Sequence, residues 1–331
     1  MTTLISCLNQ RNLHIQPNYP NSWPLPTYDF RAHPLNSLQI ELGRKLFYDP
    51  ILSLDSSISC ASCHSPHSSF THTDHSLSHG IFDSIGKRNS PVLVNLAWNK
   101  HFMWDGAVNN IEVQALAPIH NPIEMGENLD NILVKIERHN YYPALFKKAF
   151  EDQSVSSDNL LMSLAQFQLS LVSSNSKYDR MKSGTAEFTE MESKGYELFK
   201  AKCASCHAEP LFTSGNFENN GLSLDPELQD FGRFSISQQS EDKRKFKVPT
   251  LRNIGVSQPY MHDGRFNSLY EVLNHYSNGI EKSETLHPLL QNVQPLSSEE
   301  KTELVAFLLT LTDESFLENK NHQFPIHSLR D

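Results

Sequence analysis

The stretch Cys60-Ala61-Ser62-Cys63-His64 occurs early in this chain, and residues 203–207 repeat it letter for letter. C-x-x-C-H is the attachment motif of c-type haem: two thiols add to the haem vinyl groups and the histidine binds the iron. A zinc knuckle would need both cysteine pairs to converge on one metal, and a redox dithiol would need a strand–helix–strand context. Neither alternative explains a histidine directly after both pairs. We therefore expect two covalent haems, attached and ligated through Cys60, Cys63, His64, Cys203, Cys206 and His207.

The composition limits the class of protein. A chain of 331 residues with 38% hydrophobic residues suits two domains with packed cores. No apolar run approaches the ~20 residues that a membrane span requires. The net charge of −10 argues against a nucleic-acid partner and weakly favours a basic protein partner. Four of the five cysteines lie in the two motifs, so we expect no disulfide to hold the fold.

The expected location follows from the cofactor. Attachment of this type resembles that of proteins matured outside the cytoplasm, which predicts a periplasmic protein. Leu4-Ile5-Ser6-Cys7 resembles the end of a lipoprotein signal, with Cys7 as the lipidated residue. Only six residues precede Cys7, too few for a charged start and an apolar core, so an ordinary cysteine near a disordered terminus is the alternative.

Hydrophobic spacing predicts helices, and no segment has convincing strand periodicity. We expect a mainly α protein built of two tandem cytochrome c-like domains, each with one covalent c-type haem. The expected organisation is an irregular arm at 1–35, a first domain at 36–180 and a second at 181–331. We expect one helix to begin at the cap Asn36 or Ser37, and two more to span about 127–150 and 158–173. A fourth should begin near Ala186 and a fifth at the capping box 297–300, and loops are expected at 65–90 and 214–245.

The two halves are repeats of each other. Gly43-x-x-Leu46-Phe47 precedes the first motif as Gly195-x-x-Leu198-Phe199 precedes the second, and Phe70-Thr71 and Phe212-Thr213 follow. Pro91 lies fourteen residues before Asp105-Gly106, and Pro249 lies fourteen residues before Asp263-Gly264. Tandem duplication of one module is the economical explanation.

One difference between the repeats affects which haem iron can have a second protein ligand. Twelve residues after the Asp-Gly pair the second half has Tyr276, whereas the first half has Pro118. Tyrosine can bind ferric iron and proline has no donor, so we expect the second haem to be closed and the first open. Tyr276 as an ordinary core residue is the alternative. Met261 competes with it as a ligand, although its repeat counterpart Met103 suggests a packing role for both methionines.

These residues resemble the bacterial di-haem cytochrome c peroxidase family, and more closely its MauG-like branch. The similarity runs from Gly43 to Leu311 with both haem motifs in register. It includes Lys87-Arg88-Asn89-Ser90-Pro91, Phe102-Met103-Trp104-Asp105-Gly106, Gln114-Ala115-Leu116-Ala117-Pro118, Asn121-Pro122-Ile123-Glu124-Met125 and Pro259-Tyr260-Met261-His262-Asp263-Gly264.

The resemblance implies roles for individual residues. Glu124 matches the distal acid–base carboxylate of the peroxidatic haem, and Gln114 and Pro118 line the same pocket. Trp104 matches the tryptophan between the haems. Tyr276 falls where the peroxidase branch has methionine and the MauG-like branch has tyrosine.

Two further sites are implied only by the resemblance. Asn89, with the carbonyls of Ser257 and Pro259, matches a calcium site at the domain interface. In the peroxidase branch a loop histidine closes the first haem, and His79 resembles it but lies out of register in a histidine-rich segment. Chance proximity is therefore the alternative for His79.

The resemblance implies reduction of hydrogen peroxide at the first haem. Glu124 would move a proton between the peroxide oxygens, and Trp104 would pass an oxidising equivalent to the second haem. The electron donor would be a small cytochrome c or copper protein. In the MauG-like alternative, which Tyr276 favours, the oxidation is used on a protein side chain, although no second-half tryptophan leads to a surface. A plain di-haem electron-transfer cytochrome is the non-enzyme alternative.

Overall fold

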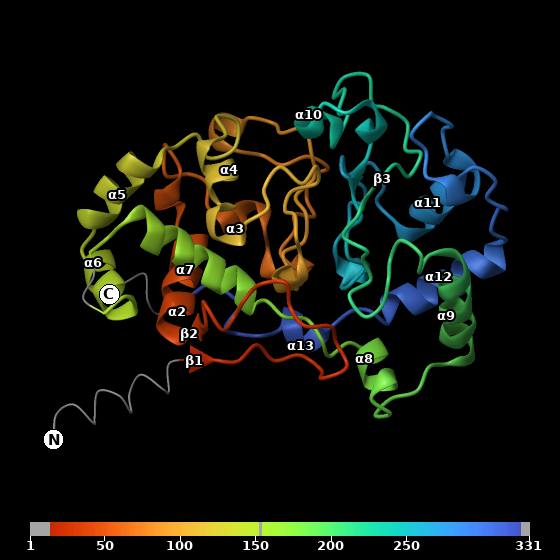
Figure 1. The fold of residues 1–331 in the computed structure, drawn as a ribbon, viewed down its shortest axis with the longest axis horizontal. Helices are drawn as coiled ribbons and strands as arrows, with labels where there is room; N and C mark the ends of the chain where they lie inside the picture. The colour runs from red at the N-terminus through yellow and green to blue at the C-terminus, as the bar shows by residue number, and fades with distance from the viewer. Residues whose placement is uncertain (1–13, 152–153, 326–331) are drawn as a thin grey trace.

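The computed structural model describes residues 14–151 and 154–325 (Figure 1). This part of the chain is mainly helical, as predicted, with two small antiparallel sheets, β1 with β2 and β3 with β4. No helix within it is long and apolar enough to cross a membrane. The strands and α-helices are β1 His14–Ile15, β2 Leu35–Asn36, α2 Ser37–Tyr48, α3 Cys60–Cys63, α4 Leu116–His120, α5 Leu129–Glu137, α6 Tyr142–Ala149, α7 Ser157–Ser170, α8 Lys177–Lys182, α9 Glu190–Lys202, β3 Phe217–Glu218, α10 Phe234–Ser237, β4 Phe246–Lys247, α11 Leu269–Asn274, α12 Ser298–Leu309 and α13 Glu314–Leu317.

Short 3₁₀ turns and one π-helical turn complete the structure. Three of the 3₁₀ helices lie in the loops predicted at 65–90 and 214–245. The 3₁₀ helices are Pro50–Leu52, Pro66–Ser68, Ile81–Asp83, Leu96–Trp98, Ile111–Val113, Ser240–Asp242, Ile254–Val256 and Pro288–Leu290, and the π-helix is His275–Gly279.

The first half is organised by α2 packed against α7. The side chain of Asn36 caps α2 by accepting from the N–H of Leu38 at 2.9 Å, which confirms the predicted start. The two helices approach closely at Gly43, where an added Cβ would lie 1.8 Å from the carbonyl oxygen of Ser163. Only glycine permits this contact between helix backbones.

The second half repeats the arrangement with α9 packed against α12. An added Cβ at Gly195 would lie 1.9 Å from the carbonyl oxygen of Glu303. The predicted capping box at the start of α12 is present, with Ser297 and Glu300 exchanging hydrogen bonds. Helix α9 begins a turn later than expected, because the capping box formed by Thr189 and Glu192 fixes its first residue.

The loops of the two halves repeat as well. Asn95 and Asn253 share a left-handed backbone, with φ of 56° and 60°. Met103 and Met261 do the same, with φ of 68° and 77°. A repeated unusual conformation in non-glycine residues supports the interpretation of the halves as one duplicated module.

Each half has its own hydrophobic core. The first core gathers residues between Trp23 and Leu171, and the second gathers residues between Tyr178 and Leu311. The segment after α12 returns to the first half, where Phe316 joins the first core. Figure 1 shows this blue segment running from α12 through α13 towards the opposite half. The boundaries at 35 and 180 stay a prediction.

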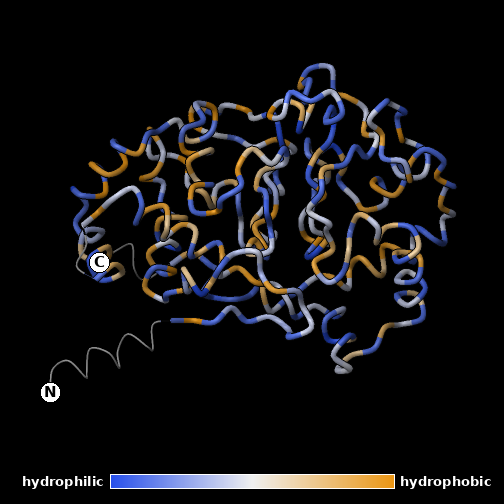
Figure 2. The backbone as a smooth tube through the Cα atoms, viewed as in Figure 1, coloured by the Kyte–Doolittle hydropathy of each residue, from blue (hydrophilic) through white to orange (hydrophobic). Residues whose placement is uncertain are grey.

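Two details differ from the expected helices. The stretch 127–150 forms two helices, α5 and α6, because Pro143 opens α6 and restricts the residue before it. The loop region 214–245 contains the short helix α10, and Figure 2 shows the chain around it to be predominantly hydrophilic.

Candidate haem and peroxide site

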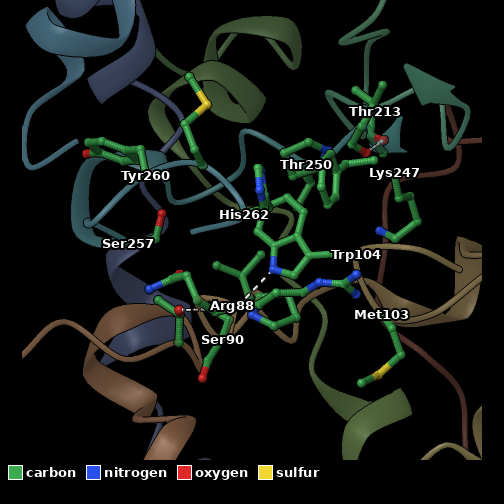
Figure 3. Close-up of a pocket in the computed structure, with 18 of the residues that line it drawn as sticks. Arg88, Ser90, Met103, Trp104, Thr213, Lys247, Thr250, Ser257, Tyr260 and His262 are labelled. Atoms are coloured by element: carbon green, nitrogen blue, oxygen red, sulfur yellow. Dashed lines mark hydrogen bonds between the residues drawn. The ribbon is translucent and has the colours of Figure 1, made fainter. Parts of the chain in front are cut away.

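A continuous cavity of about 1040 Å³ runs past both C-x-x-C-H motifs. Figure 3 shows Trp104 near its centre, with Arg88 and Ser90 of the first half and Lys247 and His262 of the second around it. Pockets for single small molecules measure about 300–1,000 Å³. This cavity lies at the upper end of that range, and because it passes both attachment motifs it suits large planar groups.

In the first motif a four-residue helix, α3, presents Cys60 and Cys63 and ends at His64. The Nδ1 of His64 lies 2.6 Å from the carbonyl oxygen of Phe70. An N–H at Nδ1 that donates to this carbonyl leaves a lone pair on Nε2 for a metal. Burial lowers the pKa of His64 to about 4, so the imidazole is neutral, the form that binds iron.

The second motif begins where α9 ends, with Cys203 as its C-cap. The Nδ1 of His207 lies 3.2 Å from the carbonyl oxygen of Phe212 and 3.1 Å from that of Pro249. Burial again lowers the pKa of the imidazole. Both histidines are therefore oriented by backbone carbonyls at equivalent positions of the repeat.

The cysteines do not suit the two simpler alternatives. Burial raises the pKa of Cys60 and of Cys203 to about 12, whereas a redox dithiol needs a lowered pKa. The described residues contain no group of three or more His, Cys, Asp and Glu side chains that could hold a metal such as zinc. None of the four motif cysteines forms a disulfide.

Pro118 and Glu124 lie together on the cavity wall of the first half. The N–H of Met125 donates to the carbonyl of Pro118 at 3.2 Å, which folds the turn after α4 back on the helix. Burial raises the pKa of Glu124, and a hydrogen bond from the Asn121 amide to its Oε1, at 2.8 Å, opposes that shift. A buried carboxyl group with a raised pKa is suited to take up and release a proton during a reaction.

Trp104 lies where the two halves meet. Its indole Nε1 donates to the carbonyl of Asn89 at 2.8 Å, and its own carbonyl accepts from the N–H of Lys247 at 2.7 Å. The first half thus holds the Trp104 side chain, and the second half holds its backbone, between the two motifs.

Tyr276 lies in the π-helical turn after α11 and lines the cavity beside the second motif. Burial raises its pKa to about 12, and an interaction with Asn220 opposes the shift. The Asn220 amide also donates to the sulfur of Met261 at 3.5 Å. The Gln114 amide donates to the sulfur of Met103 at the same distance, so both methionines have the same kind of partner.

Comparison with known proteins places the chain in a family. A family described as di-haem cytochrome c peroxidase matches residues 37–187. The methylamine utilization protein MauG of Methylorubrum extorquens is 35% identical over 89% of this chain and 83% of its own length. The cytochrome c551 peroxidase of Nitrosomonas europaea is 33% identical over 84% and 81%. A crystal structure of a MauG-like protein associated with microbial copper homeostasis matches with a TM-score of 0.85 and 31% identity, over 94% of this chain and 99% of that one.

The chain belongs to the di-haem cytochrome c peroxidase family. The chain therefore has haem c cofactors, and their attachment to the two C-x-x-C-H motifs stays a prediction. Its fold is also that of a di-haem peroxidase from Burkholderia thailandensis, at a TM-score of 0.72 and 20% identity.

In the chain described here, His79 lies in the loop beside the first motif. Its carbonyl accepts from the thiol of Cys63 at 3.5 Å, so its backbone faces the cavity. Its ring instead stacks on His75 at 4.2 Å, and its Nδ1 lies 3.5 Å from the exposed carboxylate of Asp83. In this conformation the imidazole is directed towards the surface.

The three residues that the resemblance assigns to calcium all line the cavity. Asn89 is buried, and its side-chain nitrogen donates to the carbonyl of Ser76 at 3.0 Å. Its side-chain oxygen remains available to a cation that prefers oxygen ligands.

Some residues of the site were not identified from the sequence. Arg88 of the first half bonds to Asp105 at 2.6 Å and, through two nitrogens, to Asp230 of the second half at 2.5 and 2.9 Å. Thr71 and Thr213 are equivalent positions of the repeat, but the sequence indicated no role for them. Their hydroxyl groups donate to the carbonyls of Ser90 and Val248, beside the cavity. Cys7, considered as a lipidation site, lies outside the described residues.

Proposed function

We propose that this protein reduces hydrogen peroxide at its first haem with electrons that pass through its second. Haem iron, when bound, supplies the atom at which peroxide coordinates and its oxygen–oxygen bond breaks. The observation that carries the proposal is the difference between the two ends of the cavity. The first has Pro118 and the titratable Glu124, whereas the second has Tyr276.

The chain's own residues then divide the work. Glu124 takes the proton from the inner peroxide oxygen and delivers it to the outer one, so that water can leave. His64 and His207 would hold the irons through their imidazole rings, which backbone carbonyls orient. Trp104, fixed by both halves, is the route for an oxidising equivalent between the haems, and Gln114 lines the pocket in which peroxide reacts.

Tyr276 closes the second haem as an iron ligand in this proposal. Its phenol lies in the cavity beside the second motif, and the sulfur of Met261 is engaged by the Asn220 amide. The same amide–sulfur contact recurs at Met103, which supports a packing role for both methionines. Because the His79 ring faces the surface, we propose that the first haem stays open without prior reduction.

We also propose that a calcium ion binds between the two domains. Asn89, with the carbonyls of Ser257 and Pro259, would hold the ion with oxygen ligands, as Ca²⁺ prefers. The cation would then join the two halves at the cavity. We also propose a periplasmic location, where haem of this type is attached.

The second candidate function is peroxide-dependent oxidation of a protein side chain. Tyr276 favours it, because an anionic ligand stabilises high iron oxidation states more than a neutral thioether does. In that case the partner is a protein substrate and not a small cytochrome or copper protein.

Three measurements test the proposal. The purified protein should contain two haems per chain by pyridine haemochrome assay, and Cys60→Ala and Cys203→Ala should each lose one. Peroxide should then be consumed in step with oxidation of a reduced cytochrome c. If peroxide is consumed only with a candidate protein substrate present, the second function holds. If it is consumed in neither assay, the chain is an electron-transfer cytochrome.

A further inference from the structure

Most cationic side chains that line the cavity either pair with a carboxylate or are exposed to solvent. Arg88 is paired with Asp105 and Asp230, and Lys200 lies 2.7 Å from Glu197. Lys202 also lines the cavity, but its side chain is exposed. Lys247 differs from all of these, because it lies partly buried inside the cavity and has no acidic partner among the residues that the structure describes.

The backbone fixes Lys247 in place. It ends β4, where it pairs with Phe217 of β3, and its N–H donates to the carbonyl of Trp104 at 2.7 Å. In the repeat Lys247 corresponds to Asn89, whose N–H donates to the carbonyl of His262, the counterpart of Trp104, at 2.7 Å. The lysine side chain therefore reaches the cavity from the contact between the two halves (Figure 3).

The carboxylates that line the cavity do not neutralise Lys247. Glu124 accepts from Asn121, Asp230 is bonded to Arg88, and Glu218 lies 3.9 Å from His287. Burial without a counter-charge lowers the pKa of the Lys247 ammonium to about 8. A partly buried cation without an anion is unfavourable, so a negatively charged group that occupies the cavity would stabilise it.

We propose that the Lys247 ammonium binds a carboxylate of a haem. Attachment to the motif cysteines uses the vinyl groups and leaves both haem carboxylates ionised and free to accept hydrogen bonds. A primary ammonium offers three donors to such a carboxylate. The proposal depends on the presence of haem but not on whether peroxide or a protein side chain is the final reactant.

Measurement of the haem reduction potentials tests this without turnover. A cation near a haem favours the reduced state, so Lys247→Gln should lower the reduction equilibrium constant of one haem. A unit charge about 10 Å away at an effective dielectric constant near 20 is worth roughly tenfold, which is 59 mV for a one-electron couple. Lys247→Arg, which keeps the charge, should stay close to wild type, and Lys202→Gln, at the exposed rim, should change little.

Two results would overturn the proposal. The first is a Lys247→Gln protein with two haems and unchanged potentials. The second result comes from infrared spectra of Lys247→Arg, which are needed if Lys247→Gln fails to hold both haems. Haem labelled with ¹³C at its carboxylates should then show shifted carboxylate infrared bands in Lys247→Arg, because the donor has changed from ammonium to guanidinium. Unshifted bands in that folded variant would mean that no haem carboxylate contacts residue 247.

Discussion

The indole nitrogen of Trp104 donates a hydrogen bond to the carbonyl of Asn89 at 2.8 Å. Asn89 is in turn held from the second half, because its N–H donates to the carbonyl of His262 at 2.7 Å. The second half also holds Trp104 directly, through the N–H of Lys247. The aromatic ring between the two haem motifs is therefore positioned by reciprocal bonds across the domain contact.

Trp104→Phe should keep both haems and the initial reaction with peroxide, but slow the oxidation of the second haem. Phenylalanine fills much of the space but loses the hydrogen bond to Asn89 and is harder to oxidise. Stopped-flow spectra that separate the two haems measure the effect. The matched control is Trp98→Phe, which removes an indole bonded to the carbonyl of Pro24 at 2.8 Å. Equal slowing in both variants would assign the effect to packing.

Glu124→Gln should retain both haems and lose about 10²–10⁴-fold in peroxide turnover, the usual contribution of a general acid–base group. Its neighbour Glu127 offers a control. Glu127 is buried and paired with Lys135 at 2.6 Å, so Glu127→Gln should reduce stability while turnover is kept. A loss below about tenfold in Glu124→Gln would mean that another group moves the proton.

The same two residues predict opposite pH effects on stability. Burial raises the pKa of Glu124 from 4.5, so the folded state holds its proton more tightly. Its contribution to stability is therefore lost as the pH rises through the raised pKa. For Glu127 burial acts in the same direction, but Lys135 and other donors lower the pKa overall, so its contribution is lost as the pH falls below 4.5. Chemical denaturation of each glutamine variant against pH measures both trends.

Tyr276→Phe should open the second haem and change its spectrum and reduction potential, because the phenol oxygen is lost. Tyr276→Met should raise that potential, since a neutral thioether replaces an anionic ligand. Electron paramagnetic resonance and redox titration measure these changes. Tyr270→Phe, a substitution of a half-exposed tyrosine on α11, should alter neither. An unchanged second haem in Tyr276→Phe would turn attention to Met261.

Gly43→Ala and Gly195→Ala should each lower the free energy of unfolding by about 1–3 kcal/mol, the usual cost of overpacking a core. In both cases the new methyl group meets a backbone carbonyl, which cannot rotate away as a side chain can. Urea denaturation with two spectroscopic probes measures the loss. Ser193→Ala, on the exposed side of α9, should change stability by less than about 0.5 kcal/mol.

The features predictable from the sequence are those with a local signal. The caps Asn36 and Ser297, the haem motifs and the duplicated loops all involve residues close together in the chain, and the structure contains each of them. The mainly α fold and the family were predicted correctly for the same reason.

The features that could not be predicted depend on contacts between distant residues. Arg88 and Asp230 are 142 residues apart, and no pattern near either indicates the other. The unpaired state of Lys247 is likewise a property of the packed domains, because it depends on where every nearby carboxylate is already bonded. The return of the chain after α12 to the first core also lacks a local signal, since α13 has only four residues.

That return has a consequence for how the protein is made. Phe316 packs with Phe70 at a ring distance of 6.1 Å, and the carbonyl of Phe70 orients His64. During synthesis the first motif leaves the ribosome long before Phe316 does, so the wall behind its histidine is still missing. The surroundings of His64 are thus complete only when the far end of the chain is present. A fragment ending at residue 180 would lack this wall and should not be expected to behave as an independent single-haem cytochrome.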